Sequence, residues 1–163
     1  MRILLALTAA IAAIALPAAA APEASGNLKV TVAGRDTIVL TPAEVKALPR
    51  GRTTIQVKGQ PVVYEGAVLH DALLKAGVIS GERLMGRYLN QIVILRAADG
   101  FTSILSLAET DPVYRANPVI LADTVNGQGL DAREGPYRVV VDGDLRLSRS
   151  PRAVVSIEVR PAF

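Results

Sequence analysis

The stretch ILADTVNGQGLDAREGPYRVVVDGD, residues 120–144, sets short apolar runs between turn-forming glycines. Asn126-Gly127 follows one run and Gly143 follows another, and residues of these types favour tight turns. The pattern therefore predicts strands of a sheet that are joined through turns. It also raises a functional question, because the same turns could form the rim of a ligand site that includes Arg138.

The rest of the chain continues this strand-rich pattern. Apolar and β-branched residues around turn signals predict hairpins over residues 27–40, 52–66 and 92–107. A further apolar run predicts a last strand over residues 152–160.

Two segments carry helix signals. Thr41 suits an N-cap and Pro49 stops the short helix that follows it. Residues 67–78 repeat apolar side chains at helical spacing, and Gly77 suits the C-terminal cap. A third, shorter helix is expected at the start of residues 107–118. The predicted fold class is α+β, with mixed, largely antiparallel sheets and two or three short helices.

The composition narrows the class of protein. The 163 residues suit one domain. The 18 Lys and Arg and 15 Asp and Glu are dispersed, and aromatic residues make up only 4%, so a nucleic-acid partner is not expected. The chain has no cysteine, which excludes disulfides, a thiolate nucleophile and thiolate metal ligands.

Residues 1–20 have the pattern of a secretory signal peptide. Arg2 precedes an apolar run, and small residues follow Pro17 up to an Ala-x-Ala site. We expect cleavage near Ala20, which leaves one domain over residues 21–163 in the periplasm or secreted. An uncleaved membrane anchor is the alternative. No other run approaches the ~20 apolar residues that cross a bilayer, so no membrane association is expected after cleavage.

A set of motifs spread over the chain has a familiar order and spacing. An aromatic-x-Gly-x-x-Leu-x-x-x-Leu pattern runs into Ala-Gly-Val, and Asp-Gly, Asn-Gly-x-x-Leu and Gly-Pro-x-Arg motifs follow. The residues that carry these motifs are Tyr64, Gly66, Leu69, Leu73, Ala76, Gly77, Val78, Asp99, Gly100, Asn126, Gly127, Leu130, Gly135, Pro136 and Arg138. Together they resemble the molybdopterin-binding oxidoreductase domain, the sulfite-oxidase-type fold, over residues 28–161. The resemblance implies a single molybdopterin-binding-like domain over residues 21–163, with molybdopterin as cofactor and redox chemistry as activity.

The chain departs from this family at several positions. Enzymes of the family hold molybdenum through a cysteine, and the comparable position here is Val57, which cannot ligate a metal. Phe101 stands where a tyrosine often follows the Asp-Gly turn. Short relatives often read Arg-Trp-Val-Arg near the end, whereas this chain keeps only the two arginines, Arg149 and Arg152. The residues therefore leave open whether the protein is an enzyme.

The arginines of the last quarter are the main candidates for ligand binding. Arg138, Arg149 and Arg152 could bind the phosphate tail of a pterin, because guanidinium groups pair well with phosphate. On this hypothesis they converge with Asn126 on one concavity. The alternative is a solvated face whose charges pair with Asp142 and Asp144.

His70 is the one histidine of the chain and the remaining candidate for cofactor contact. It lies in the helix expected over residues 67–78, so a place at the core edge or on the helix surface is favoured over ligand contact. No second metal ligand stands at a suitable spacing, and no metal site is expected. No nucleophile elbow, phosphate-binding loop or dinucleotide fingerprint is present, so no catalytic residue is predicted.

Three functions follow from these observations. The first is a module that binds a pterin or another small anionic ligand without oxo-transfer at a cysteine-ligated metal. The second is an interaction or sensory accessory protein that receives a periplasmic protein partner on the same fold. The third is an active molybdenum oxidoreductase, which would need its metal held by the cofactor's dithiolene alone.

Overall fold

The computed structural model of the chain describes residues 26–163. The signal peptide expected over residues 1–20, and its cleavage site, lie outside the described residues. Within residues 26–163, none of the helices combines the length and the apolar character that a bilayer crossing requires.

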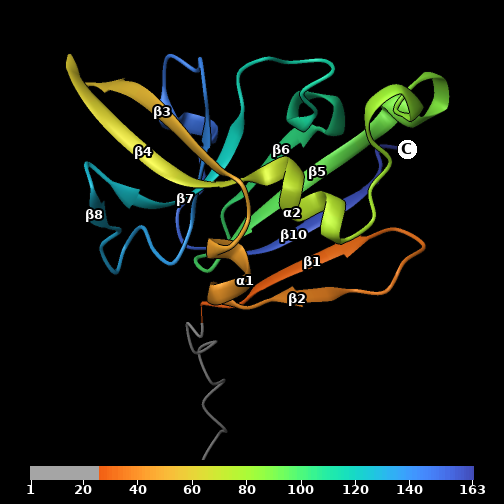
Figure 1. The fold of residues 1–163 in the computed structure, drawn as a ribbon, viewed down its shortest axis with the longest axis horizontal. Helices are drawn as coiled ribbons and strands as arrows, with labels where there is room; N and C mark the ends of the chain where they lie inside the picture. The colour runs from red at the N-terminus through yellow and green to blue at the C-terminus, as the bar shows by residue number, and fades with distance from the viewer. Residues whose placement is uncertain (1–25) are drawn as a thin grey trace, which may run out of the picture.

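One five-stranded sheet, sheet A, contains both ends of the described chain (Figure 1). Its strands run in the order β2-β1-β10-β5-β6. Their bounds are β1 Leu28–Val32, β2 Ile38–Leu40, β5 Gln91–Ala97, β6 Thr102–Ser106 and β10 Val154–Pro161. β1 and β10 are parallel and the other neighbours are antiparallel, so sheet A is mixed.

The second sheet, sheet B, is antiparallel throughout and centres on β7. Its order is β3-β4-β7-β8, and β9 also pairs with β7. Its strands are β3 Arg50–Val57, β4 Gln60–Val68, β7 Val119–Val125, β8 Gln128–Gly129 and β9 Arg138–Val141. The stretch that predicted strands and turns thus supplies the centre of this sheet.

The helical elements are short. The α-helices are α1 Pro42–Lys46 and α2 Leu69–Lys75, and the 3₁₀ turns are η1 Gly81–Arg83, η2 Gly86–Asn90, η3 Leu107–Thr110 and η4 Leu147–Arg149. A capping box between Thr41 and Glu44 begins α1. Gly77 takes a φ of 82° just after α2.

The helix expected at the start of residues 107–118 is only the turn η3. Asp111 precedes Pro112 and is extended, with φ −94° and ψ 127°. A residue before proline is disfavoured in the α region, so η3 cannot continue into an α-helix.

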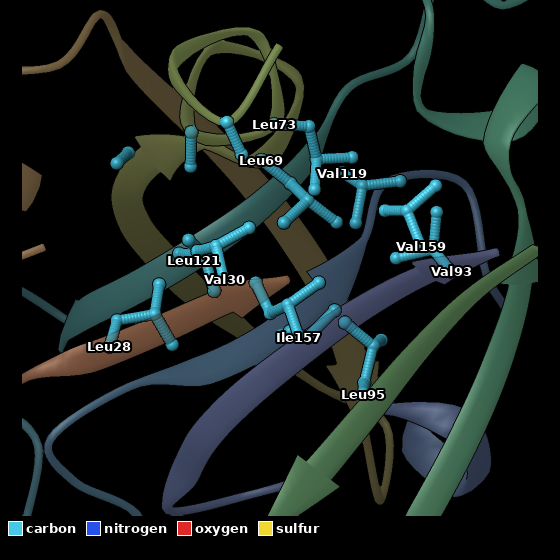
Figure 2. Close-up of a cluster of buried hydrophobic side chains, with 14 of the residues drawn as sticks. Leu28, Val30, Leu69, Leu73, Val93, Leu95, Val119, Leu121, Ile157 and Val159 are labelled. Carbon is cyan, nitrogen blue, oxygen red and sulfur yellow. The ribbon is translucent and has the colours of Figure 1, made fainter. Parts of the chain in front are cut away.

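The main core lies between the two sheets and beneath α2 (Figure 2). Leu69 and Leu73 of α2 point toward Val119 and Leu121 of β7, and Ile157 of sheet A lies in the same cluster. Strand residues alternate in direction. β7 therefore carries a second set of buried side chains on its other face.

That other face of sheet B has a smaller apolar cluster of its own. Ile120 and Ala122 of β7 pack there with Ile55, Tyr64 and Val140. Because both faces of β7 are buried, its sequence is a continuous apolar run rather than an alternating one. The predicted class, α+β with mixed, largely antiparallel sheets and short helices, is confirmed.

Candidate functional site

A polar pocket of about 220 Å³ opens where the two sheets meet. The β5–β6 turn, the first residue of β9 and the segment from η4 to β10 form its walls. We call it the Arg138 pocket, and its lining residues are Asp99, Phe101, Arg138, Leu147, Ser148, Ser150, Pro151 and Arg152.

The alternation of β9 places Arg138 in this pocket. Val139 and Val141 face the main core, so Arg138 and Val140 face the smaller cluster on the other side of sheet B. The side chain of Arg138 is only 9% exposed. A cation this deeply buried requires partners.

Arg138 has two partners, and both leave part of its guanidinium free. Nη1 forms a short ion pair with Glu134 and also donates to the hydroxyl of Tyr64 at 3.3 Å. Its Nε, however, has no hydrogen-bond partner within residues 26–163. The hydroxyl of Ser150, also buried and lining the pocket, is likewise without one among the described residues. An unsatisfied buried polar group costs about 1–3 kcal/mol.

Arg152 supplies the accessible positive charge of the pocket. It is exposed, and within residues 26–163 it takes part in no ion pair. Its charge also acts on Tyr64. Burial raises the pKa of Tyr64, and the positive charges of Arg138 and Arg152 oppose that rise. The carboxylate of Asp99 accepts from the backbone N–H of Phe101 at 2.9 Å, which stabilises the β5–β6 turn.

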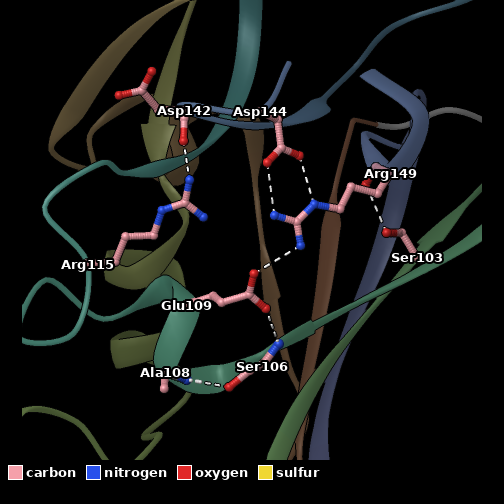
Figure 3. A network of polar contacts seen from close by, with 8 residues as sticks. All are labelled: Ser103, Ser106, Ala108, Glu109, Arg115, Asp142, Asp144 and Arg149. Atoms are coloured by element: carbon pink, nitrogen blue, oxygen red, sulfur yellow. Dashed lines mark hydrogen bonds and ion pairs between the residues drawn. The ribbon is translucent and has the colours of Figure 1, made fainter. Parts of the chain in front are cut away.

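Arg149 comes from the same segment but is not part of the pocket lining. Its guanidinium lies between Asp144 and Glu109 (Figure 3). Its Nε and Nη2 donate to Asp144 at 2.7 and 2.9 Å, and its Nη1 donates to Glu109 at 2.9 Å. This pairing holds the pKa of Asp144 below its usual range, against the effect of burial. Ser103 also donates to the backbone carbonyl of Arg149 at 2.8 Å. Arg149 therefore anchors η4, and thereby positions the neighbouring Ser150.

Of the two aspartates that the solvated-face alternative named, only Asp144 pairs with a candidate arginine. Asp144 pairs with Arg149, whereas Arg115 donates to the backbone carbonyl of Asp142 (Figure 3). Arg138 and Arg152 pair with neither aspartate. Of the three predicted arginines, the structure brings two together.

Asn126 lies outside the Arg138 pocket. It occupies the turn between β7 and β8 with a φ of 49°, and its side-chain carbonyl accepts from the N–H of Val63 at 2.9 Å. Its role in the structure is to form the turn and to tie it to β4.

His70 also lies apart from that pocket. It is 7% exposed in α2, and its Nε2 is 3.3 Å from the hydroxyl of Ser80. It lines a separate cavity of about 270 Å³ with Thr110 and Arg115. Its position is at the core edge. Asp111 lies nearby, where burial would raise its pKa but the N–H groups of Gly81 and Val113 lower it overall.

Sequence reasoning missed two polar members of the site. Glu134 precedes Arg138 by four residues, but that spacing indicates contact only in a helix, and this segment is a turn. Ser150 carries no sequence signal, because its burial depends on how η4 packs against β6.

The donors around the Arg138 pocket fit an anion and not a metal ion. Residues 26–163 contain no group of three His, Cys, Asp or Glu side chains placed to hold a metal. Val57, which the sequence comparison aligned with the metal-binding cysteine of the resembled family, packs against the cluster that contains Tyr64. Two guanidinium groups and a serine hydroxyl suit the phosphate of a pterin cofactor, but nothing in this set can ligate its metal.

Comparison with known proteins bears on the fold alone. No family model and no curated protein sequence matches the chain. Among solved structures, the chain is similar to the sulfane dehydrogenase SoxCD from Paracoccus pantotrophus, with a TM-score of 0.60 and 18% identity. The match covers 83% of this chain but 39% of that one. This likeness is consistent with the sulfite-oxidase-like fold expected from the sequence motifs.

Proposed function

We propose that this chain binds a small anionic ligand in the Arg138 pocket, and that the phosphate end of a pterin is that ligand. The observation that carries the proposal is the pair of buried donors, Nε of Arg138 and the hydroxyl of Ser150, that lack partners within residues 26–163. Two guanidinium groups and one carboxylate line the pocket, and because Glu134 already pairs with Arg138, Arg152 is the cation left for a ligand anion. Such a lining favours an anion over a neutral ligand.

Each lining residue has a separate role in this proposal. Arg152, exposed at the mouth, attracts and pairs with the anion, whereas buried Arg138 and Ser150 fix its orientation. The ring of Phe101 is 46% exposed beside them and offers a flat surface for stacking. The pocket is smaller than the 300–1,000 Å³ typical of sites for whole ligands, so the phosphate enters and the rest of the ligand stays outside.

Bound molybdopterin would bring redox chemistry at its metal, but this chain offers no thiolate to hold that metal. The protein therefore acts as a binding module rather than as an oxo-transfer enzyme. The leader pattern over residues 1–20 supports export, so the ligand is met in the periplasm or outside the cell.

The test is to purify the exported protein from a molybdenum-replete host and to measure the pterin and molybdenum that it carries. Mass spectrometry should find a pterin phosphate with the wild-type protein and much less with Arg152→Gln, and metal analysis should find no stoichiometric molybdenum. Stoichiometric molybdenum would overturn the binding-module account. Protein that carries no pterin and also fails to bind inorganic phosphate would refute the anion site.

A second candidate, a scaffold for a periplasmic protein partner, is supported by one edge of sheet A. β6 is the last strand of that sheet, and its Ile104 is 55% exposed. An exposed edge strand with an apolar side chain can receive a strand from a partner. In this case Ile104→Lys would abolish co-purification of that partner and leave phosphate binding intact.

A further inference from the structure

A second cavity, larger than the Arg138 pocket and sharing no residue with it, lies beside the β1–β2 turn. Its volume is about 450 Å³, within the range of small-molecule sites. We call it the Arg35 pocket, and its lining residues are Val32, Ala33, Gly34, Arg35, Gly77, Val78, Ile79, Tyr88, Gln91, Leu107 and Val159.

The floor of the Arg35 pocket is apolar and belongs to the main core. Val78, Leu107 and Val159 are each at most 5% exposed, and they come from the segment after α2, from η3 and from β10. Ile79 and Tyr88 are half-buried along the wall. A ligand that covers this floor would bury its own surface against apolar side chains. Such burial favours an aliphatic or aromatic group.

Arg35 places a cation beside this floor. Its side chain lies against Gly77 so closely that a Cβ there would be 3.1 Å from its Nη1 and 3.2 Å from its Cζ. Gly77 also has a φ of 82°, so glycine at this position serves both the helix end and the approach of Arg35.

The guanidinium of Arg35 is without an ion-pair partner in the described part of the chain. Within residues 26–163 its side chain forms neither an ion pair nor a hydrogen bond, although Arg50, Arg96 and Arg138 all pair with carboxylates. Packing against Gly77, rather than a salt bridge, places this cation. The amide of Gln91, half-buried in the same lining, is a second hydrogen-bonding group.

We propose that the Arg35 pocket binds a small amphipathic carboxylic acid. The carboxylate pairs with the guanidinium of Arg35, and the apolar body covers Val78 and Leu107. Arginine pairs with a carboxylate through two parallel hydrogen bonds, which gives orientation as well as affinity. The site is independent of the Arg138 pocket, so the two proposals stand or fall separately.

The test compares a probe acid with its matched amide. 3-Phenylpropionate and 3-phenylpropionamide have nearly the same shape and differ in charge. In ¹H–¹⁵N spectra the acid should shift the amides of Gly77 and Val78 in a saturable way, with a dissociation constant of about 1 mM or below. The amide should bind about tenfold more weakly, because it lacks the charge that pairs with Arg35.

Two variants isolate the contribution of Arg35. Arg35→Gln should reduce acid binding to the level of the amide, whereas Arg83→Gln makes the same charge change at an exposed arginine outside the pocket and should leave binding unchanged. Both side chains are exposed, so both variants should melt as the wild type does.

Four outcomes would overturn the proposal. The first three are the absence of saturable binding of the acid up to about 10 mM, equal affinities for acid and amide, and unchanged binding in Arg35→Gln. Shifts confined to Arg138 and Ser150 would place the acid in the other pocket and would equally refute it.

Discussion

The guanidinium of Arg138 lies over the ring of Tyr64, with its central carbon 5.4 Å from the ring centroid. The two residues belong to β9 and β4, which flank β7 on opposite sides. Ala122 of β7 pairs with Arg138 on one side and with Gly66 on the other. Because Ala122 carries only a methyl group, the long side chain of Arg138 can extend across β7 to Tyr64.

Glu134→Gln should strengthen anion binding in the Arg138 pocket. Glu134 is the carboxylate that pairs with Arg138, and a ligand phosphate must compete with it. Its neutralisation should raise phosphate affinity by about three- to tenfold, measured by calorimetric titration at constant ionic strength. Glu82→Gln changes an exposed carboxylate elsewhere and serves as the control. The same gain in both variants would point to net charge rather than to this pair.

Gly66→Ala should strongly destabilise the fold. A Cβ at Gly66 would be 1.9 Å from the carbonyl oxygen of Leu121, a backbone atom that cannot move aside. We expect a loss of about 3 kcal/mol or more in the free energy of unfolding, measured by urea denaturation. Gly129→Ala, where a Cβ would meet nothing within 4 Å, should stay within about 0.5 kcal/mol of the wild type. Similar losses in the two variants would contradict the packing shown at Gly66.

Arg149→Gln should cost stability at neutral pH and much less in acid. Arg149 lowers the pKa of Asp144, so the ion pair stabilises the folded state fully above the ordinary value of 3.8. That contribution is lost as the pH falls through the lowered folded-state pKa. We expect a difference of about 1 kcal/mol between variant and wild type at pH 7. Urea denaturation from pH 7 down to pH 2 should show this difference shrinking, and a constant difference would refute the assignment.

Tyr137→Phe should leave stability at pH 7 unchanged or slightly raised. The hydroxyl of Tyr137 is buried without a hydrogen-bond partner within residues 26–163, and burial raises its pKa to about 12. Between pH 10 and pH 12 the unfolded chain loses this proton while the folded state retains it, so the wild type loses stability as the pH rises. The variant should lack that part of the alkaline loss. Ultraviolet titration should also show one tyrosine fewer ionising near pH 12.

The sequence predicted those features that depend only on residues close together in the chain. Thr41 and Glu44 lie three residues apart and form the capping box with their own backbone. The pairing across Asp99-Gly100 likewise depends on the turn alone. The Tyr64-x-Gly66 motif is visible in the sequence, but the sequence does not show why glycine is required at position 66. Only the close approach of Leu121 shows why the third residue is glycine.

The residues predicted to form one site are kept apart by contacts between segments that are distant in the sequence. Arg149 and Arg152 lie three residues apart, and nothing in the sequence separates their roles. In the structure Arg149 meets Asp144 and Glu109, whereas Arg152 stays at the mouth of the pocket. The turn η4 and the distant η3 decide this difference. Asn126 was assigned to the ligand because it belongs to a family motif, and the structure uses it in a turn.

The most direct test of the central claim is a titration of the Arg138 pocket with a pterin monophosphate, followed by ¹H–¹⁵N spectra. We predict saturable shifts at Arg138 and Ser150, and affinity about tenfold lower in Arg152→Gln. Arg146→Gln, an exposed arginine of the same segment outside the pocket lining, should bind as the wild type does. Equal loss of affinity in the two variants, or no saturable shift at Arg138 and Ser150, would contradict the account.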